Sequence, residues 1–458
     1  MTNVPAAAVR RSEWLGHPRG LAFLFATELW ERFSYYGMRA LLVLYMIKYL
    51  LLPGHAEAAW GFLAIRGMLE AAFGPLSTQA LASQIYGLYT GLVYLTPVFG
   101  GLLADRVLGQ RRTVVIGAVL MAFGHFMMAF ESLFFLALLL LILGNGAFKP
   151  NIATQIGGLY PPGDSRIDRA YSIFYVGINL GAFLAPLVCG TLGEAAGWHY
   201  GFTAAGFGML IGLAIYLRAA PLLPADPIRP ALAALEAPHA SGLGGLARLL
   251  LLCVPVTLFW ATYEQQGNTI ALWADEFTDR TFRLGPLAGE IPTTWFQAFN
   301  PFMIFAFTPL VIALWAHQAR GGREPSTVTK LALGCFGVTL ANLILAWAAV
   351  RLGAGERSSW LWLFGYFIVI TVGELYLSPT GLSLVSKLAP AGMLSMAMGF
   401  WLATSFIGNF MAGWLGSYWD RMSKPAFFMM IAVVAAVAGI AIWLIEWRWS
   451  RPQASGRR

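Results

Sequence analysis

Long, mostly apolar stretches constrain the fold of this chain more than any other feature of its sequence. Each is about 20 residues or longer, which is the length an α-helix needs to cross the hydrocarbon core of a bilayer. Twelve such stretches occur, at about 21–49, 80–104, 112–131, 133–156, 171–196, 200–219, 246–274, 291–317, 328–352, 359–388, 391–418 and 424–447. The sequence therefore predicts an all-α polytopic membrane protein with twelve transmembrane helices.

The composition agrees with this prediction. Hydrophobic residues make up 58% of the 458 residues and charged residues only 11%, whereas about a quarter of a soluble domain is charged. Strands of a membrane β-barrel would alternate apolar and polar residues. Stretches such as "LFFLALLLLILG" are continuously apolar instead, so helices are favoured over a barrel.

The basic residues indicate how the chain is oriented. Most of the 30 Lys and Arg residues fall at the two ends of the chain or in the even-numbered predicted loops. By the positive-inside rule, both termini are expected in the cytoplasm. The net charge of +8 is thus a topology signal, and we expect no nucleic-acid partner. No cleavable signal peptide is recognisable, and we expect a multi-pass protein of a bacterial-type inner membrane.

A proline-rich segment divides the apolar stretches six and six. The sequence over 218–245 reads "RAAPLLPADPIRPALAALEAPHASGLGG", which is typical of an extended linker. We predict an N-terminal six-helix bundle over 1–217, a cytoplasmic linker over 218–245 and a C-terminal six-helix bundle over 246–458. Two further spans would need about 40 residues, so the linker is too short to hold an additional helix pair.

Signatures of catalysis or metal binding are missing from the sequence. The three cysteines, Cys189, Cys253 and Cys335, are widely spaced in apolar sequence, so they predict neither a disulfide nor a metal site. There is no H-E-x-x-H and no G-x-S-x-G sequence, and His125 stands alone in a predicted helix. We therefore expect a protein that is not an enzyme and that has no metal and no cofactor.

The first predicted helix carries charge where hydrocarbon would tolerate none. At 100° per residue, its polar side chains fall within an arc of about 140°. They are Glu28, Glu31, Arg32, Tyr35, Tyr36 and Arg39. The opposite side is apolar or small, so we expect this helix to turn one polar face into the protein.

Three more ionisable residues, Lys149, Glu264 and Glu374, lie in the middle of other predicted helices. Seven unpaired charges in a membrane would cost on the order of 20 kcal/mol, so they must pair, face water or change protonation. One interpretation is a set of ion pairs that only fixes helix packing. The other, which we favour, is a polar cavity for a substrate that bears both charges, together with a proton relay.

Several short motifs occur in order along both halves of the chain. They are "ELWERFSYYG" (28–37), "VYLTPVFGGLLADRVLG" (93–109), "GNGAFKPN" (144–151), "FYVGINLGAF" (174–183), "WFQAFNP" (295–301), "GELYLSPTGLSLVSKLAP" (373–390) and "WLATSFIGN" (401–409). With these motifs the chain resembles the proton-dependent oligopeptide transporter (POT) family of the major facilitator superfamily. That resemblance implies two six-helix bundles that rock around a central site. Many bacterial members have an additional helix pair between the bundles, which this chain lacks room for.

The resemblance also implies substrate-binding residues. Arg39 and Lys149 would hold the carboxylate of a peptide, Glu374 and Asn300 would face its amino group, and Asn179 would contact its backbone. The walls of the pocket would come from Tyr35, Tyr36, Tyr89, Trp260, Ser378 and Trp401. Such walls would be largely apolar with polar tips.

For proton coupling, the resemblance implies the residues Glu28, Glu31, Arg32 and Glu264. Protonation of the first three would loosen their hold on Lys149, and Glu264 would pair with Arg39 across the two bundles. The resemblance does not identify the glutamate that carries the transported proton.

The function implied is proton-driven symport of di- and tripeptides into the cell by alternating access. The expected partners are small peptides, protons and the lipid bilayer, the expected state is a monomer, and the proton gradient takes the place of a cofactor. The alternative is a relative that carries another small solute, such as nitrate, a drug-like amine or another metabolite. The long segment over 53–79 predicts a short amphipathic helix at the outer surface, where Arg66 would gate against Glu276.

Overall fold

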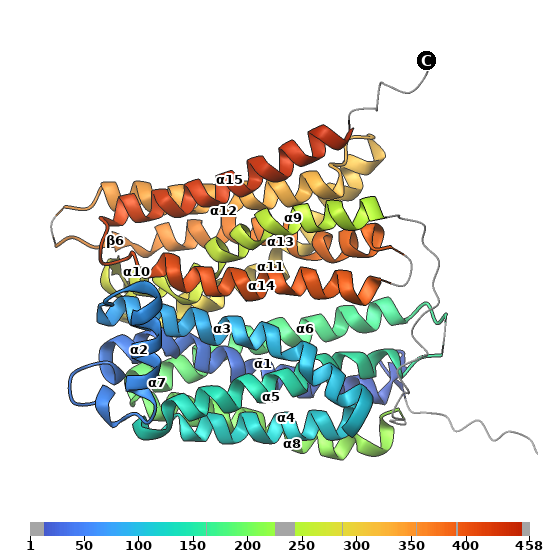
Figure 1. The fold of residues 1–458 in the computed structure, drawn as a ribbon, viewed down its shortest axis with the longest axis horizontal. Coiled ribbons are helices and arrows are strands. Elements are labelled where there is room, and N and C mark those ends of the chain that lie inside the picture. Colours follow the sequence, from blue (N-terminus) through green and yellow to red (C-terminus); the bar gives the residue numbers. More distant parts are fainter. Residues whose placement is uncertain are drawn as a thin grey trace, which may run out of the picture.

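The computed structural model describes residues 13–161, 163–224, 243–285, 287–353, 355–390 and 393–450. Most of the predicted linker, residues 225–242, lies outside this part of the chain, as do residues 1–12 and 451–458. The described residues form long helices that lie side by side in two groups (Figure 1). The all-α class is confirmed.

The N-terminal bundle consists of long helices and short segments that join or extend them. The long helices are α1 (Arg19–Tyr45), α3 (Thr78–Leu103), α4 (Gln110–Met127), α5 (Phe134–Gly157), α6 (Ile167–Ala185) and α8 (Trp198–Ala219). The short segments are β1 (Glu13–Trp14), β2 (His17–Pro18), η1 (Met46–Leu50), η2 (Ala56–Ala58), α2 (Phe62–Phe73), η3 (Ala104–Leu108), η4 (Glu131–Leu133), η5 (Pro186–Gly190), α7 (Thr191–Ala195) and η6 (Ala220–Leu222).

The C-terminal bundle also consists of long helices with short segments that join or extend them. Its helices are α9 (Leu243–Tyr263), α10 (Thr269–Glu276), α11 (Phe299–Arg320), α12 (Thr327–Val350), α13 (Trp360–Leu388), α14 (Leu394–Gly416) and α15 (Lys424–Ser450), with the short segments η7 (Glu264–Gly267) and η8 (Thr293–Ala298). The strands β4 (Thr281–Leu284) and β5 (Leu287–Glu290) form an antiparallel hairpin, in which Thr281 is opposite Glu290. The strands β3 (Thr278–Asp279) and β6 (Ser358–Ser359) pair in parallel.

Each predicted apolar stretch coincides with a helix or a helical series to within a few residues. Four stretches change helix type along their length: 21–49 becomes α1 and η1, 171–196 becomes α6, η5 and α7, 246–274 becomes α9, η7 and α10, and 291–317 becomes η8 and α11. The break within 171–196 begins at Pro186, which has no N–H to donate to the preceding turn. In the described ranges, nine helical segments are long and apolar enough to cross a membrane. They do not include α1, which carries four charged side chains in its middle, so the count of twelve stays a prediction.

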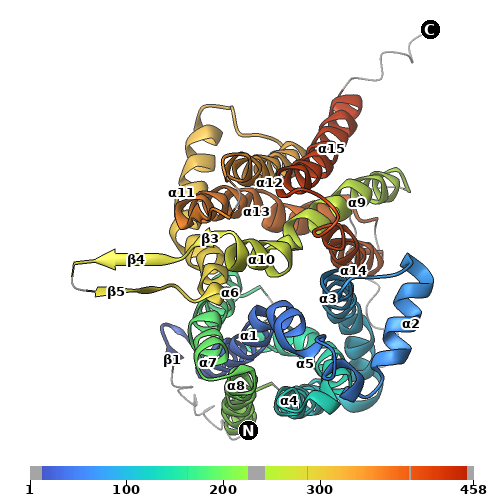
Figure 2. The same ribbon diagram turned by 90° about the vertical axis from the view of Figure 1, so that its left-hand side faces the viewer.

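The two ends of the molecule differ. One end carries α2, α7, α10 and the β4–β5 hairpin, and it faces the viewer in Figure 2; we call it the hairpin end. The opposite end, where α1 begins and α15 ends (Figure 1), is called the terminal end. The predicted short helix in the 53–79 segment is present as α2, which lies across the direction of the long helices (Figure 2). Arg66 pairs with Glu70 of the same helix, with 3.0 Å between Nε and Oε1, and among the described residues it forms no ion pair with Glu276 in this structure.

Glycines let the long helices approach closely. A Cβ atom at Gly100 of α3 would lie 1.9 Å from the backbone oxygen of Gly146 in α5. At the contact between the bundles, a Cβ atom at Gly87 would lie 2.7 Å from the backbone of Gly413 in α14. Small residues are common where membrane helices cross, because within lipid the hydrophobic effect does not drive helices together and close packing must do so.

We predict that Gly100→Ala destabilises the protein, whereas Gly101→Ala does not. The new methyl group at position 100 meets backbone, which cannot rotate away, so the helices must separate at a cost of about 1–3 kcal/mol. The nearest atom to a Cβ at Gly101 is 4.0 Å away. Thermal unfolding of the purified proteins, followed by tryptophan fluorescence, measures the difference. Equal unfolding temperatures for the two variants would contradict this packing argument.

Candidate functional site

A cavity of about 250 Å³ lies between the two bundles. Its lining includes polar and aromatic side chains from both halves of the chain. The N-terminal bundle contributes Tyr36, Arg39, Tyr94, Tyr175 and Asn179, and the C-terminal bundle contributes Trp260, Tyr263, Glu264, Gln266, Gln297, Asn300, Glu374 and Ser378. A site built by both bundles can change shape when they move relative to each other.

An ion pair joins the bundles at this cavity. The guanidinium of Arg39 on α1 donates to a carboxylate oxygen of Glu264 on η7, and its Nε donates to the Tyr86 hydroxyl over 2.8 Å. The two charged side chains are only 12% and 3% exposed, so each depends on the other for charge compensation. The predicted pairing of Glu264 with Arg39 is present.

On the other side of the cavity, Glu374 of α13 is held by hydrogen bonds alone. Its Oε2 accepts from Nδ2 of Asn300 over 2.8 Å, and the same amide lies 3.1 Å from the Thr371 hydroxyl. Among the described residues, Glu374 forms no ion pair. An oriented carboxylate that lines a cavity without a cationic partner is suited to receive a cation.

The remaining charges of α1 lie outside the cavity lining. Glu28, Glu31 and Arg32 are each at most 3% exposed. Arg32 donates from Nη2 to Glu31 over 2.7 Å, and its Nε lies 3.4 Å from Oε1 of Glu28. Nδ2 of Asn145 lies 3.3 Å from Glu31. Two carboxylates therefore share one guanidinium.

Lys149 of α5 lies next to an aromatic ring. Its Nζ is 4.8 Å from the ring centre of Tyr94, and Tyr94 lines the cavity. In the described part of the chain, Lys149 forms no ion pair with Glu28 or Glu31. The predicted contact of Lys149 with that cluster is therefore not made as an ion pair in this structure.

The other predicted site residues divide into two groups. Tyr36, Asn179, Trp260 and Ser378 line the cavity, and the hydroxyl of Ser378 and the indole nitrogen of Trp260 lack hydrogen-bond partners among the described residues. Tyr35, Tyr89 and Trp401 do not line it, and each is at most 4% exposed. The ring of Tyr35 lies under Arg32, and Trp401 packs against Gly381.

Several lining residues did not appear among the predicted site residues. They are Tyr94, Tyr175, Tyr263, Gln266 and Gln297. Tyr94, Tyr175 and Gln297 fall within motifs quoted above, so the motifs contained a signal for them. Tyr263 and Gln266 lie on ordinary helical sequence, where an aromatic or amide side chain cannot be told from a packing residue without knowing which face meets the other bundle.

The contacts between the bundles are concentrated toward the hairpin end. Among the described residues, the polar contacts between the bundles lie in the part of the molecule from the Arg39–Glu264 pair to the hairpin end. Besides the Arg39–Glu264 pair, they join Lys48 to Asp275, Ser77 to Asp420, Gln79 to Gly416, Ser83 to Asn268, Thr191 to Trp295, Glu194 to Thr293, Thr294 and Arg280, Pro186 to Thr294, Gln297 to Ala40, and Arg421 to Pro75. The cavity is thus closed off at the hairpin end by direct bonds.

We predict that Arg39→Ala costs more stability than the double variant Arg39→Ala/Glu264→Gln. Removing the arginine leaves a buried carboxylate without a partner, at a cost of about 3–5 kcal/mol, and neutralising the glutamate recovers part of that loss. Thermal unfolding measures the loss of stability in Arg39→Ala, in Glu264→Gln and in the double variant, each relative to the unsubstituted protein. Arg66→Ala, which breaks an exposed pair with Glu70, is the control and should cost about 1 kcal/mol or less. Additive losses in the double variant would show that the two charges do not interact.

Comparisons with known proteins agree with the fold and the cavity. The chain is 33% identical over 518 aligned residues to the peptide transporter YePEPT of Yersinia enterocolitica, covering 97% of this chain and 96% of that protein. It is 32% identical to a di-/tripeptide transporter of Lactococcus lactis subsp. cremoris, covering 94% and 96%. The crystal structure of a peptide transporter POT in complex with sulfate superposes with a TM-score of 0.83 at 30% identity, covering 96% and 97%.

A second solved structure is a POT family transporter in complex with 5-aminolevulinic acid, with a TM-score of 0.82 at 26% identity over 96% of this chain and 99% of that one. The sequence model of the POT family matches residues 111–231 and 240–434, well over half of the chain. These matches and the cavity between two bundles lead to one assignment: the chain belongs to the POT family of transporters.

Proposed function

We propose that this protein carries di- and tripeptides into the cell together with protons, by alternating access. The observation that carries the proposal is the placement of opposite charges around one cavity: Arg39 on the N-terminal bundle and Glu374 on the C-terminal bundle. An unblocked peptide has a carboxylate at one end and an ammonium at the other, so it is complementary to such a site. Relatives named as peptide and di-/tripeptide transporters support the same substrate class.

The electrostatics suggest how a proton takes part. Arg39 is occupied by Glu264, so the carboxylate of a peptide must compete with Glu264 for the guanidinium. A proton on Glu264 removes that competition and frees the fork of donors on Arg39 for the substrate. Substrate and proton are then carried in the same transport cycle, as symport requires.

The cluster of Glu28, Glu31 and Arg32 supplies a second place for a proton. Its two carboxylates share one guanidinium, so protonation of one of them leaves the other fully paired. In the proposed cycle this change weakens the attraction between the cluster and Lys149, which then turns toward the peptide carboxylate. The transported proton belongs to these coupled groups together.

The orientation proposed for the chain relates the closed end of the cavity to one side of the membrane. With both termini in the cytoplasm, the hairpin end faces the outside. The bonds between the bundles close the cavity on that side, as expected for an inward-facing state. We propose a monomer in a bacterial-type inner membrane, driven by the proton gradient without a cofactor.

A second candidate is transport of another small zwitterion. The site offers charges for a carboxylate and an amine, and Asn179 is the one group assigned to the peptide backbone. A relative bound to 5-aminolevulinic acid, which has an amine and a carboxylate but no peptide bond, favours this alternative.

Uptake by purified protein in liposomes, driven by an imposed pH gradient, tests the proposal. We expect accumulation of a labelled dipeptide that unlabelled di- and tripeptides inhibit and free amino acids, nitrate and 5-aminolevulinic acid do not. Lys149→Ala and Glu374→Gln should each lower uptake at least tenfold, because each removes one charge that the peptide requires. Lys387→Ala and Glu290→Gln, which alter exposed charges away from the cavity, are the matched controls. Uptake at the control level in either site variant would defeat this binding scheme.

For the coupling cluster, we expect Glu31→Gln to abolish accumulation against a gradient while leaving peptide exchange between the two sides. The amide keeps the size of the side chain but does not gain or lose a proton. Counterflow of labelled dipeptide, measured without a pH gradient, separates the two activities. Accumulation at the wild-type level would show that Glu31 is a packing residue.

A further inference from the structure

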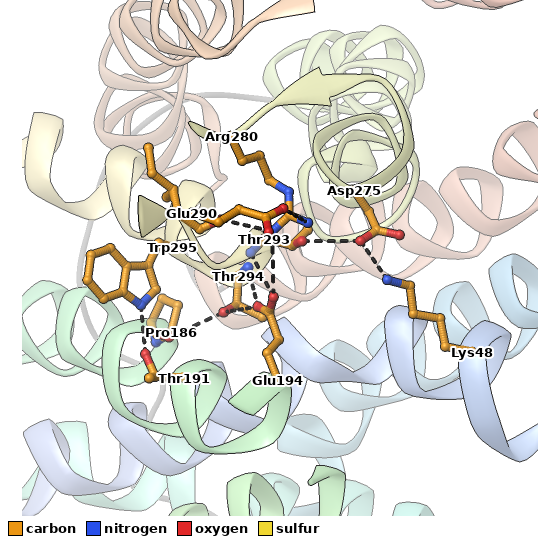
Figure 3. A network of polar contacts seen from close by, with 11 residues as sticks. Lys48, Pro186, Thr191, Glu194, Asp275, Arg280, Glu290, Thr293, Thr294 and Trp295 are labelled. Carbon is orange, nitrogen blue, oxygen red and sulfur yellow. Dashed lines mark hydrogen bonds and ion pairs between the residues drawn. The ribbon is translucent and has the colours of Figure 1, made fainter. Parts of the chain in front are cut away.

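Glu194 of α7 reaches from the N-terminal bundle to the start of a helix in the C-terminal bundle (Figure 3). Its Oε2 accepts the backbone N–H of Thr293 over 2.8 Å. Its Oε1 accepts the backbone N–H of Thr294 over 2.8 Å and the Thr294 hydroxyl over 2.7 Å. One side chain thus makes three hydrogen bonds across the boundary between the bundles.

These bonds satisfy donors that the helix cannot satisfy itself. Thr293 and Thr294 are the first residues of η8, which continues into α11, and the first N–H groups of a helix have no partner within it. The preceding residue, Pro292, has no side chain that can cap them. A carboxylate at this position also interacts favourably with the positive end of the helix dipole. The N-cap of this helix is therefore supplied by the other bundle.

The surrounding residues bring Glu194 into place. A Cβ atom at Gly190 would lie 2.0 Å from the hydroxyl oxygen of Thr294, so only glycine allows η5 and η8 to approach this closely. The indole N–H of Trp295 donates to Thr191 over 2.8 Å. Arg280 lies 4.0 Å from Glu194 but pairs more closely, at 2.7 Å, with Glu290 of its own bundle.

The capped segment also leads into the cavity. Gln297, three residues after Thr294, donates to the Ala40 carbonyl of α1 over 3.2 Å, and Asn300 donates to Glu374. Movement of η8 away from α7 must therefore carry two lining residues with it. Contact at the hairpin end and the shape of the cavity are connected through one short helical segment.

We propose that Glu194 is the latch of the hairpin end: its carboxylate caps η8 when the bundles are closed there, and it releases η8 when they open. The proposal goes beyond the substrate assignment and depends on the proposed function only for the idea that the bundles alternate. When the latch opens, water must replace three bonds to a charged group, so its loss should shift the equilibrium toward the open hairpin end by about tenfold or more.

The test is a distance measurement between the bundles without added peptide. Spin labels are placed on cysteines that replace Phe130 and Leu361, which are 61% and 59% exposed on opposite bundles; the three native cysteines are buried. Double electron–electron resonance in lipid nanodiscs then reports the separation. We expect one short distance for the otherwise unchanged chain and a second, longer distance in Glu194→Gln, which keeps the size but not the charge.

Glu290→Gln is the matched control, because Glu290 pairs with Arg280 within the C-terminal bundle. It should leave the distances unchanged. Thr294→Val removes one of the three bonds and should populate the longer distance to a smaller extent, which keeps the test decisive if Glu194→Gln does not fold. Unchanged distances in Thr294→Val and in a folded Glu194→Gln protein would overturn the proposal, as would the same shift in Glu290→Gln. Because no peptide is added, a failed substrate assignment leaves this result intact.

Discussion

The cost of holding charge inside a membrane is the constraint on which the rest of this structure depends. Arg39 and Glu264 are both nearly buried and belong to different bundles. Among the described residues, neither member of this pair forms an ion pair within its own bundle, so the closed arrangement of the bundles supplies the opposite charge. In the proposed cycle, a bound peptide or a proton replaces this interaction between the bundles.

Helix α1 carries two groups of charged side chains on the same face. Glu28 and Glu31 share the guanidinium of Arg32, while Arg39, about two turns further along the same face, reaches the other bundle. In the proposed cycle the first group responds to protons and Arg39 responds to substrate. Both belong to one continuous helix, Arg19–Tyr45, which connects them directly in that cycle.

Much of the fold could be predicted because apolar length is a local property of the sequence. A break such as that at Pro186 divides one predicted membrane span into shorter helical segments but hardly moves its ends. That buried charges need partners could also be predicted from the residues, but the pairing of Arg39 with Glu264 came only from the resemblance to the POT family. The positions of Tyr35 and Trp401 could not, because a large aromatic side chain serves equally well in a pocket wall and in a helix crossing. The role of Glu194 has no local signal at all, since its partners are backbone N–H groups about a hundred residues away.

We propose that the cavity recognises its substrate through the two terminal charges of the peptide. Binding of Ala-Ala, N-acetyl-Ala-Ala and Ala-Ala-amide to the purified protein, measured by the ligand-dependent shift in unfolding temperature, tests each charge separately. We predict that the unblocked dipeptide stabilises the protein and that each blocked peptide binds at least tenfold more weakly. Equal stabilisation by all three peptides would show that the cavity does not recognise the terminal charges.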